Sequence, residues 1–172
     1  FDSIISGARL KIIPPIVAPG WGGRLHFVEV EVDEDRLWPD AVMEAGPNTP
    51  SNYNIHKVAD RYPPTGKGKR KVKMVLVNLT NGGNFAKAVA WAEEFDLKRA
   101  NPRQVFAIGK NKPQLHKEFG MDPMYVAASE ECAFGGYRQV CGVWWYGSAR
   151  WASLRWVGDV GGSYDWVAFL CE

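Results

Sequence analysis

The clearest strand pattern in this chain is RLHFVEVEV at residues 24–32, in which side-chain polarity alternates with a period of two. One face carries His26, Val28, Val30 and Val32, and the other carries Leu25, Phe27, Glu29 and Glu31. Because successive side chains of a strand point to opposite faces, the pattern predicts a half-buried strand. We expect its glutamates to face water, although two carboxylates so close could also bind a cation. An earlier strand is predicted at Ala8–Val17, where two prolines interrupt the run.

Two helices are predicted in the middle of the chain. Phe85–Leu97 has apolar residues at intervals of three and four, and Asn84 is a suitable N-cap. A second helix opens at Asn101-Pro102, an N-cap followed by proline at the first helical position, and ends near Gly109.

A short third helix is predicted at Pro113–Phe119, with Gly120 as its C-terminal stop. His116 lies in this segment among polar residues that include Gln114, Lys117 and Glu118. We therefore expect a surface histidine and not a metal or substrate ligand.

Residues 34–69 are rich in Pro, Asn, Gly and Asp and show little periodicity. Helical turns are predicted around Pro39–Glu44 and Asn54–Ala59, and the remainder is expected to be loop. Such a loop is unusually long for a compact domain, so we interpret the segment as an insertion.

A basic run leads from this segment into a predicted strand at Lys73–Leu79. The run consists of Lys67, Lys69, Arg70, Lys71 and Lys73. It could contact nucleic acid, but no aromatic side chains are interleaved, which favours a solvated strand entry.

The chain after Met124 is predicted to form strands and tight turns. The strands are expected at Met124–Ala128, Tyr137–Tyr146, Trp151–Val157 and Tyr164–Cys171. Within the last of these, Trp166–Cys171 is apolar on both faces, which is typical of a central strand. The order of strands, then helices, then strands predicts an α+β fold.

Composition agrees with one globular domain over residues 1–172. The chain is 46% hydrophobic and 23% charged, with a mean hydropathy of −0.26. Its formal net charge of +2 is too small to require nucleic acid or an anionic membrane as partner. No apolar stretch approaches the roughly 18 residues that cross a bilayer, so we expect no membrane insertion.

The N-terminal residues show no signal-peptide pattern and no initiator Met, so the natural start could lie upstream.

The three cysteines are Cys132, Cys141 and Cys171. Their odd number favours a reducing compartment, with reduced thiols preferred over a Cys132–Cys141 bridge. We expect a cytoplasmic or virion-associated protein.

Five of the eight tryptophans lie in the last thirty residues, Val143–Glu172. Alternation in the strand Trp151–Val157 assigns Ala152, Leu154 and Trp156 to a core face, and Trp151, Ser153, Arg155 and Val157 to an exposed or partner-facing one. Trp144, Trp145, Trp156 and Trp166 are expected to fill the core. If the turns before and after this strand meet at one end of the sheet, their polar and aromatic residues form one patch.

The mixture of Tyr, Trp and Arg with Ser and Gly is typical of a binding surface. It does not suggest a proton-transfer or metal site. The sequence therefore favours recognition over chemistry.

The second half of the chain resembles the C-type lectin fold, in the version found in formylglycine-generating enzymes and in the variable proteins of diversity-generating retroelements. The resemblance rests on Asn101-Pro102-Arg103, on ECAFGGYR at 131–138 and on VWWYGSARWASLRWVGDVGGSYDWVAFL at 143–170. Residues 34–69 find no counterpart in it.

This resemblance implies a non-catalytic protein of phage or prokaryotic origin, with a surface that mutagenesis directed at adenines diversifies. The variable region would lie at about 132–166. The ligand-binding positions would be Tyr146, Ser148, Ala149, Trp151, Arg155, Asp159, Ser163 and Tyr164. The ligand would be a protein or a cell-surface molecule, and no cofactor or metal is expected.

Three other functions can be weighed against this interpretation. The enzyme branch of the same fold needs a reactive cysteine pair with a bound metal, which the spacing of the three cysteines does not reproduce. Calcium-dependent sugar binding would need more oxygen ligands than Asp159 and Asp165 supply. Nucleic-acid binding would depend on the basic run at 67–73.

Overall fold

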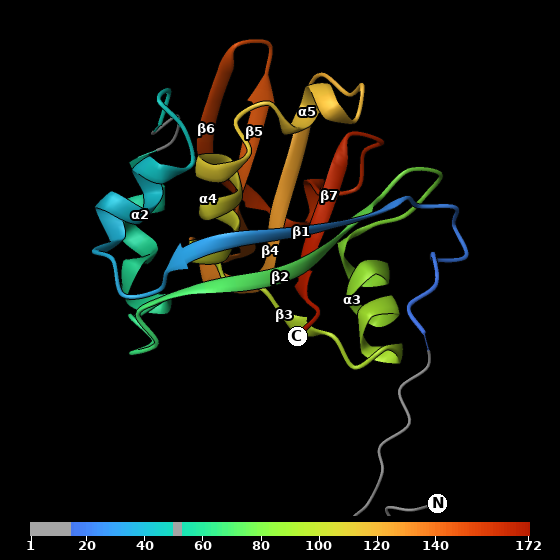
Figure 1. Ribbon diagram of the computed structural model, residues 1–172, viewed down its shortest axis with the longest axis horizontal. Coiled ribbons are helices and arrows are strands. Elements are labelled where there is room, and N and C mark those ends of the chain that lie inside the picture. The colour runs from blue at the N-terminus through green and yellow to red at the C-terminus, as the bar shows by residue number, and fades with distance from the viewer. Residues whose placement is uncertain (1–14, 50–52) are drawn as a thin grey trace, which may run out of the picture.

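Seven strands form one sheet within residues 15–49 and 53–172, the part of the chain that the computed structural model describes (Figure 1). They are β1 Leu25–Asp33, β2 Lys69–Asn78, β3 Lys98–Arg99, β4 Met124–Phe134, β5 Tyr137–Tyr146, β6 Ala149–Trp156 and β7 Asp165–Leu170. The order is β1-β2-β7-β4-β5-β6, with β3 paired to β7. Pairs are antiparallel except β4 with β7. The strand expected at Ala8–Val17 falls largely outside the described residues.

Helices cover both faces of this sheet. They are α2 Trp38–Glu44, α3 Phe85–Glu94, α4 Pro102–Asn111 and α5 Leu115–Glu118, with 3₁₀ helices η1 Tyr53–Arg61 and η2 Val157–Asp159. Figure 1 shows α2 and α4 to one side of the sheet and α3 to the other. The core accordingly has two parts, one containing Trp38 and Phe106, the other Phe85 and Trp91. The prediction of a mixed α+β fold is confirmed, and none of the described helices is long and apolar enough to span a membrane.

The helix starts follow the capping residues of the sequence. The Asn84 side chain accepts a hydrogen bond from the Lys87 amide at 2.8 Å, and α3 begins directly after it. Asn101 and Gln104 form a reciprocal capping box at the start of α4. At the other end of α3, Asp96 adopts a left-handed conformation with φ 56°, so the helix ends before the predicted Leu97.

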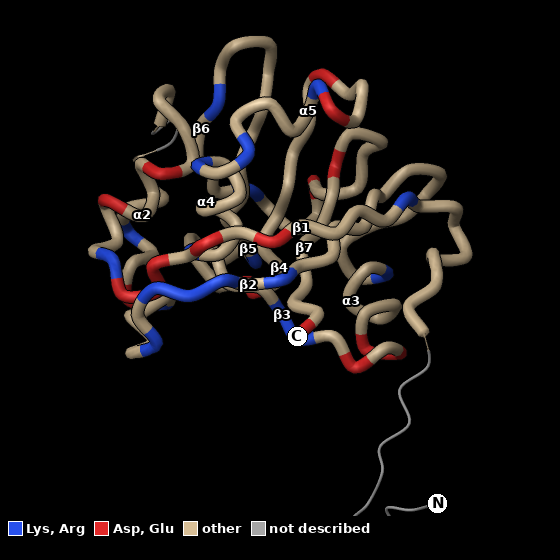
Figure 2. The backbone as a smooth tube through the Cα atoms, viewed as in Figure 1, with Lys and Arg blue, Asp and Glu red and all other residues tan. Residues whose placement is uncertain are grey.

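Strand β1 alternates as its sequence predicts, with Val28, Val30 and Val32 buried. The basic run lies opposite the acidic face of β1, which Figure 2 shows as blue and red positions side by side. The register pairs Glu29 with Lys73, Glu31 with Lys71 and Asp33 with Lys69. Carboxylates thus lie opposite the lysines of β2, which weakens the electrostatic attraction that nucleic acid would need. Strand β2 also begins at Lys69, earlier than predicted.

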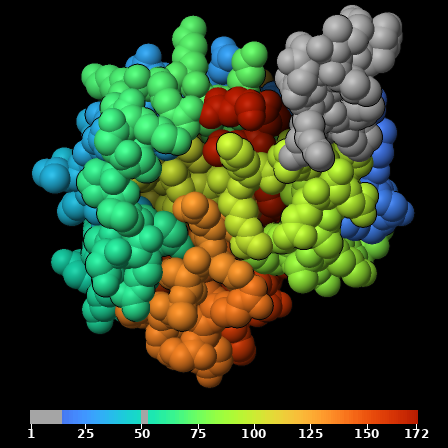
Figure 3. Space-filling view, turned by 90° about the horizontal axis from the view of Figure 1, so that it is seen from below, coloured from blue at the N-terminus to red at the C-terminus, as the bar shows by residue number. Residues whose placement is uncertain are grey.

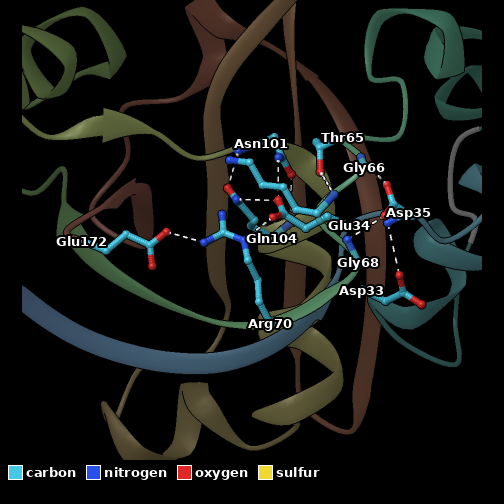
Figure 4. Close-up of polar contacts among 11 residues, drawn as sticks. Asp33, Glu34, Asp35, Thr65, Gly66, Gly68, Arg70, Asn101, Gln104 and Glu172 are labelled. Atoms are coloured by element: carbon cyan, nitrogen blue, oxygen red, sulfur yellow. Dashed lines mark hydrogen bonds and ion pairs between the residues drawn. The ribbon is translucent and has the colours of Figure 1, made fainter.

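The segment 34–69 contributes to the core through the two helical turns expected in it. Ile55 and Val58 of η1 are fully buried, as is Val42 of α2. A polar cluster ties the segment to the sheet (Figure 4). At its centre the buried carboxylate of Glu34 accepts hydrogen bonds from Arg70 at 2.5 Å and from the Gln104 side chain at 2.8 Å.

The prediction that His116 lies at the surface is wrong. The side chain is 1% exposed, and its Nε2 donates to the carbonyl of Gly147 at 2.8 Å. Gly147 belongs to the turn that joins β5 to β6, so a contact distant in sequence buries a residue that is followed in α5 by Lys117 and Glu118. Its Nδ1 has no hydrogen-bond partner among the described residues.

Two assignments in β6 are also wrong. Trp156 lies on the same face as Leu154, as predicted, but it is the last residue of β6 and is 49% exposed. There its ring packs edge-on against Tyr137, with the ring centroids 4.5 Å apart. Ser153, expected on an exposed face, is 6% exposed. That face is therefore covered at Ser153, although it is exposed nearer the turn at Tyr146.

Candidate binding face on the β5–β6 hairpin

Three aromatic rings gather where β5 and β6 approach their connecting turn. Trp144 of β5 lies directly opposite Trp151 of β6, and their rings stack with centroids 6.3 Å apart. Tyr164, just before β7, brings its ring to 5.7 Å from that of Trp144. Tyr146 follows on the same face of β5 and is 61% exposed. We call Trp144, Tyr146, Trp151 and Tyr164 the aromatic face.

The side chain of Arg155 lies beneath these rings. Its guanidinium carbon is 4.9 Å from the centroid of Trp144 and 4.4 Å from that of Tyr125 in β4. Tyr125 is fully buried, and its ring packs against Trp144 at 4.7 Å. Cation–π contacts of this kind are strongest when they are desolvated. The aromatic face therefore has a charged and aromatic layer underneath it.

A buried carboxylate fixes the arginine in place. Asp165, which is 0% exposed, accepts a hydrogen bond from Arg155 at 2.9 Å. Its second oxygen accepts from the amides of Gly161 and Gly162 at 3.0 and 2.9 Å. Burial opposes the charge of Arg155, but the Tyr125 hydroxyl and the Asp165 carboxylate raise its pKa above the usual value. The ion pair thus holds the loop before β7 against the hairpin.

Gly142 of β5 makes room for this arrangement. A Cβ atom at this position would lie 2.3 Å from the Tyr125 hydroxyl and 2.5 Å from the carbonyl oxygen of Val126. Any larger residue would displace the tyrosine ring on which Arg155 rests.

The structure brings together only part of the predicted ligand-binding set. Tyr146, Ala149, Trp151 and Tyr164 lie at or beside the aromatic face, and Ser148 is exposed in the adjoining turn. The other three positions are arranged differently. Arg155 is mostly covered, its side chain being 15% exposed; Asp159 is exposed in η2 beyond the far end of β6; and Ser163 opens onto a neighbouring cavity.

Sequence reasoning missed the supporting residues of this face. Tyr125 sits inside an apolar run, and nothing in its neighbours indicates that it supports an arginine. Asp165 could have been found from the sequence, because an acid at the start of a strand that is buried on both faces needs a buried partner. Trp144, expected to be core, is instead the partly exposed centre of the face.

Comparisons with known proteins identify no protein that is similar to this chain. No family model matches the chain, and no curated protein or solved structure gives a significant match.

A second aromatic group lies at the other end of the same hairpin. Tyr137 and Trp156, which we call the aromatic pair, are 53% and 49% exposed. They lie beside the turn between β4 and β5, which projects in orange in the view from below (Figure 3). Gln139, the cross-strand neighbour of Trp156, is directed to the carbonyl of Phe134. Among the described residues, no ion pair supports either ring.

The cysteines lie elsewhere. Cys132 and Cys141 are buried, and burial raises the pKa of the Cys141 thiol well above its usual value. Such a thiol is a poor nucleophile at neutral pH. Within residues 15–49 and 53–172, no three His, Cys, Asp or Glu side chains are grouped closely enough to hold a metal ion.

Proposed function

We propose that the protein binds a ligand, without catalysis, on the aromatic face. The observation that carries this proposal is the support of partly exposed rings by the buried Arg155–Asp165 pair. Rings whose positions are fixed before a ligand binds lose little conformational freedom on binding, which lowers the free-energy cost of binding. Aromatic side chains of this kind commonly supply most of the affinity of an interface.

A more specific form of the proposal is that the protein has a C-type lectin fold and that a retroelement diversifies its binding surface. Its ligand would then be a protein or a cell-surface molecule. It is supported by the exposure of Tyr146, Ser148, Asp159, Ser163 and Tyr164, which lie outside the core. Substitutions there would change the surface without changing the packing. Arg155 does not meet this condition, so it belongs to the supporting layer in this proposal.

Genomic context tests the diversification. The proposal expects a near-copy of the 3′ coding end that differs mainly at adenines, next to a reverse transcriptase gene. A complete flanking sequence without such a copy would remove diversification but leave binding on the aromatic face open.

Binding itself is tested with an array of bacterial surface proteins and glycans. Each molecule that the parent chain binds is measured again with a face variant in which Tyr146, Trp151 and Tyr164 are replaced by Ser. A matched control replaces the aromatic pair, Tyr137 and Trp156, by Ser. The proposal expects the face variant to lose binding at an unchanged melting temperature, and the control to keep it.

A further inference from the structure

A cavity of about 490 Å³ adjoins the aromatic face and is not used by the function proposed above. It lies where β2 ends and where β4 and β7 begin, and Tyr164 belongs to both its wall and the aromatic face. Its volume falls within the range of about 300–1,000 Å³ that is usual for small-molecule sites. A ligand on the face could therefore extend into it.

Arg24 supplies the positive charge of this cavity. Its guanidinium lies over the ring of the buried Trp166, 5.4 Å from the centroid, and its carbonyl accepts from the Asn78 amide at 2.9 Å. Within the described part of the chain, no carboxylate forms an ion pair with Arg24. Its planar fork of N–H donors therefore remains open to a ligand and matches the two oxygens of a carboxylate.

The rest of the lining narrows the choice of ligand. Thr80 and Ser163 supply hydroxyl groups, and Tyr164 supplies a flat ring as well as a hydroxyl. Asp122 is the one acid of the lining, and its Oδ1 accepts from the Gly147 amide at 2.9 Å. One cation beside one acid favours a monoanion over a doubly charged phosphate.

We propose that this cavity binds the carboxylate of a small aromatic acid, with the acid group on Arg24 and the ring against Tyr164. The proposal deepens the proposed function and rests on it, because it assigns a ligand class to the edge of the same face. The hydroxyls of Thr80 and Ser163 complete the hydrogen bonding of the acid.

The test compares three probes of similar shape by isothermal titration calorimetry on the full chain: phenylacetate, its neutral amide phenylacetamide, and phenyl phosphate. Phenylacetate is expected to bind at least about tenfold more tightly than the amide, since a charge-assisted pair is worth more than a neutral one. Phenyl phosphate is expected to bind more weakly than phenylacetate. The preference for the acid should fall as salt is raised.

Arg24→Gln is expected to abolish the preference of acid over amide, and Arg24→Lys, which keeps the charge but loses the fork, to retain part of it. The control Lys57→Gln removes the same charge from an exposed residue of η1 and should leave the preference unchanged. A thermal melt confirms that each variant is folded. Equal binding of acid and amide, no binding of either, or a preference that survives Arg24→Gln would overturn the proposal.

A double variant that spares Tyr164 separates this result from the proposed function. Replacing Tyr146 and Trp151 by Ser leaves the cavity lining intact, so phenylacetate should still bind with its preference. If phenylacetate fails while the face variant loses a ligand found on the array, the cavity proposal alone is overturned. If phenylacetate binds through Arg24 and no array ligand depends on the face, the proposed function alone is overturned.

Discussion

The β5–β6 hairpin carries two groups of exposed aromatic rings on opposite faces, and they differ in what lies beneath them. The aromatic face rests on Tyr125 and on the buried Arg155–Asp165 pair. The aromatic pair, Tyr137 and Trp156, consists of two half-exposed rings packed edge-on against each other. Both are exposed, so exposure alone does not distinguish a binding surface. The support that fixes the rings before a ligand arrives does.

The largest difference in the free energy of unfolding is expected between replacements of two tryptophans that were both predicted to fill the core. Trp166→Ala removes a ring that is 1% exposed, and should lower the free energy of unfolding by about 3–5 kcal/mol. Trp156→Ala removes a half-exposed ring and should cost about 1 kcal/mol or less. Urea unfolding measures both. A cost for Trp156 equal to that for Trp166 would show that the aromatic pair belongs to the core.

The support beneath the aromatic face is tested by Arg155→Ala. The change leaves Asp165 buried and unpaired, and we expect a loss of about 3 kcal/mol in the free energy of unfolding. A double-mutant cycle with Asp165→Ala should give a coupling energy of about 1–3 kcal/mol. The exposed pair Arg138–Glu131 is the control, and should couple by less than about 1 kcal/mol. Similar couplings in the two cycles would show that the buried pair supports the aromatic face no more than an exposed ion pair does.

A smaller effect is expected at Gly142. Its replacement by Ala places a Cβ against the Tyr125 hydroxyl and should cost about 1–3 kcal/mol through overpacking. Gly158→Ala adds a methyl group where no atom lies within 4 Å, and should change stability by about 0.5 kcal/mol or less. Thermal melts of both variants give the comparison. If Gly142→Ala were neutral, Tyr125 would not be held as tightly as the proposed support requires.

The smallest effect is a pH response far from both aromatic groups. The amides of Gly66 and Gly68 donate to Asp35 at 2.6 Å each, and these bonds lower its pKa below the ordinary 3.8. A depressed carboxylate pKa stabilises the fold above the unfolded value, and this stabilisation is lost as pH falls through the folded value. In an NMR titration, the two glycine amides should therefore shift together below pH 3.8, while the ring contacts of the aromatic face stay unchanged. Shifts centred above that pH would contradict the assignment.

Local patterns predicted much of the fold. The alternation of β1, the N-caps Asn84 and Asn101, and the central position of β7 each depend on neighbours in sequence, and each is confirmed. What failed depends on distant contacts. Alternation placed Trp156 on the correct face but could not show that this face is exposed at the end of β6.

The candidate site was predicted in part for the same reason. Aromatic composition indicated a surface around Tyr146, Trp151 and Tyr164. Strand alternation also placed Arg155 on the ligand-facing side, because it could not show the pairing with Asp165, which follows ten residues later across a loop. His116 was misplaced by a contact with Gly147 that only the tertiary fold creates.

The most direct test of the central claim compares the affinity of the face variant and of the aromatic-pair variant for the same array ligand. Replacing Tyr146, Trp151 and Tyr164 by Ser should weaken binding by about a hundredfold or more, since two or three anchors of this kind are worth at least about 3 kcal/mol. Replacing Tyr137 and Trp156 by Ser should change the dissociation constant by less than about threefold, with both variants folded. Loss of binding in the aromatic-pair variant, with binding retained in the face variant, would contradict the account.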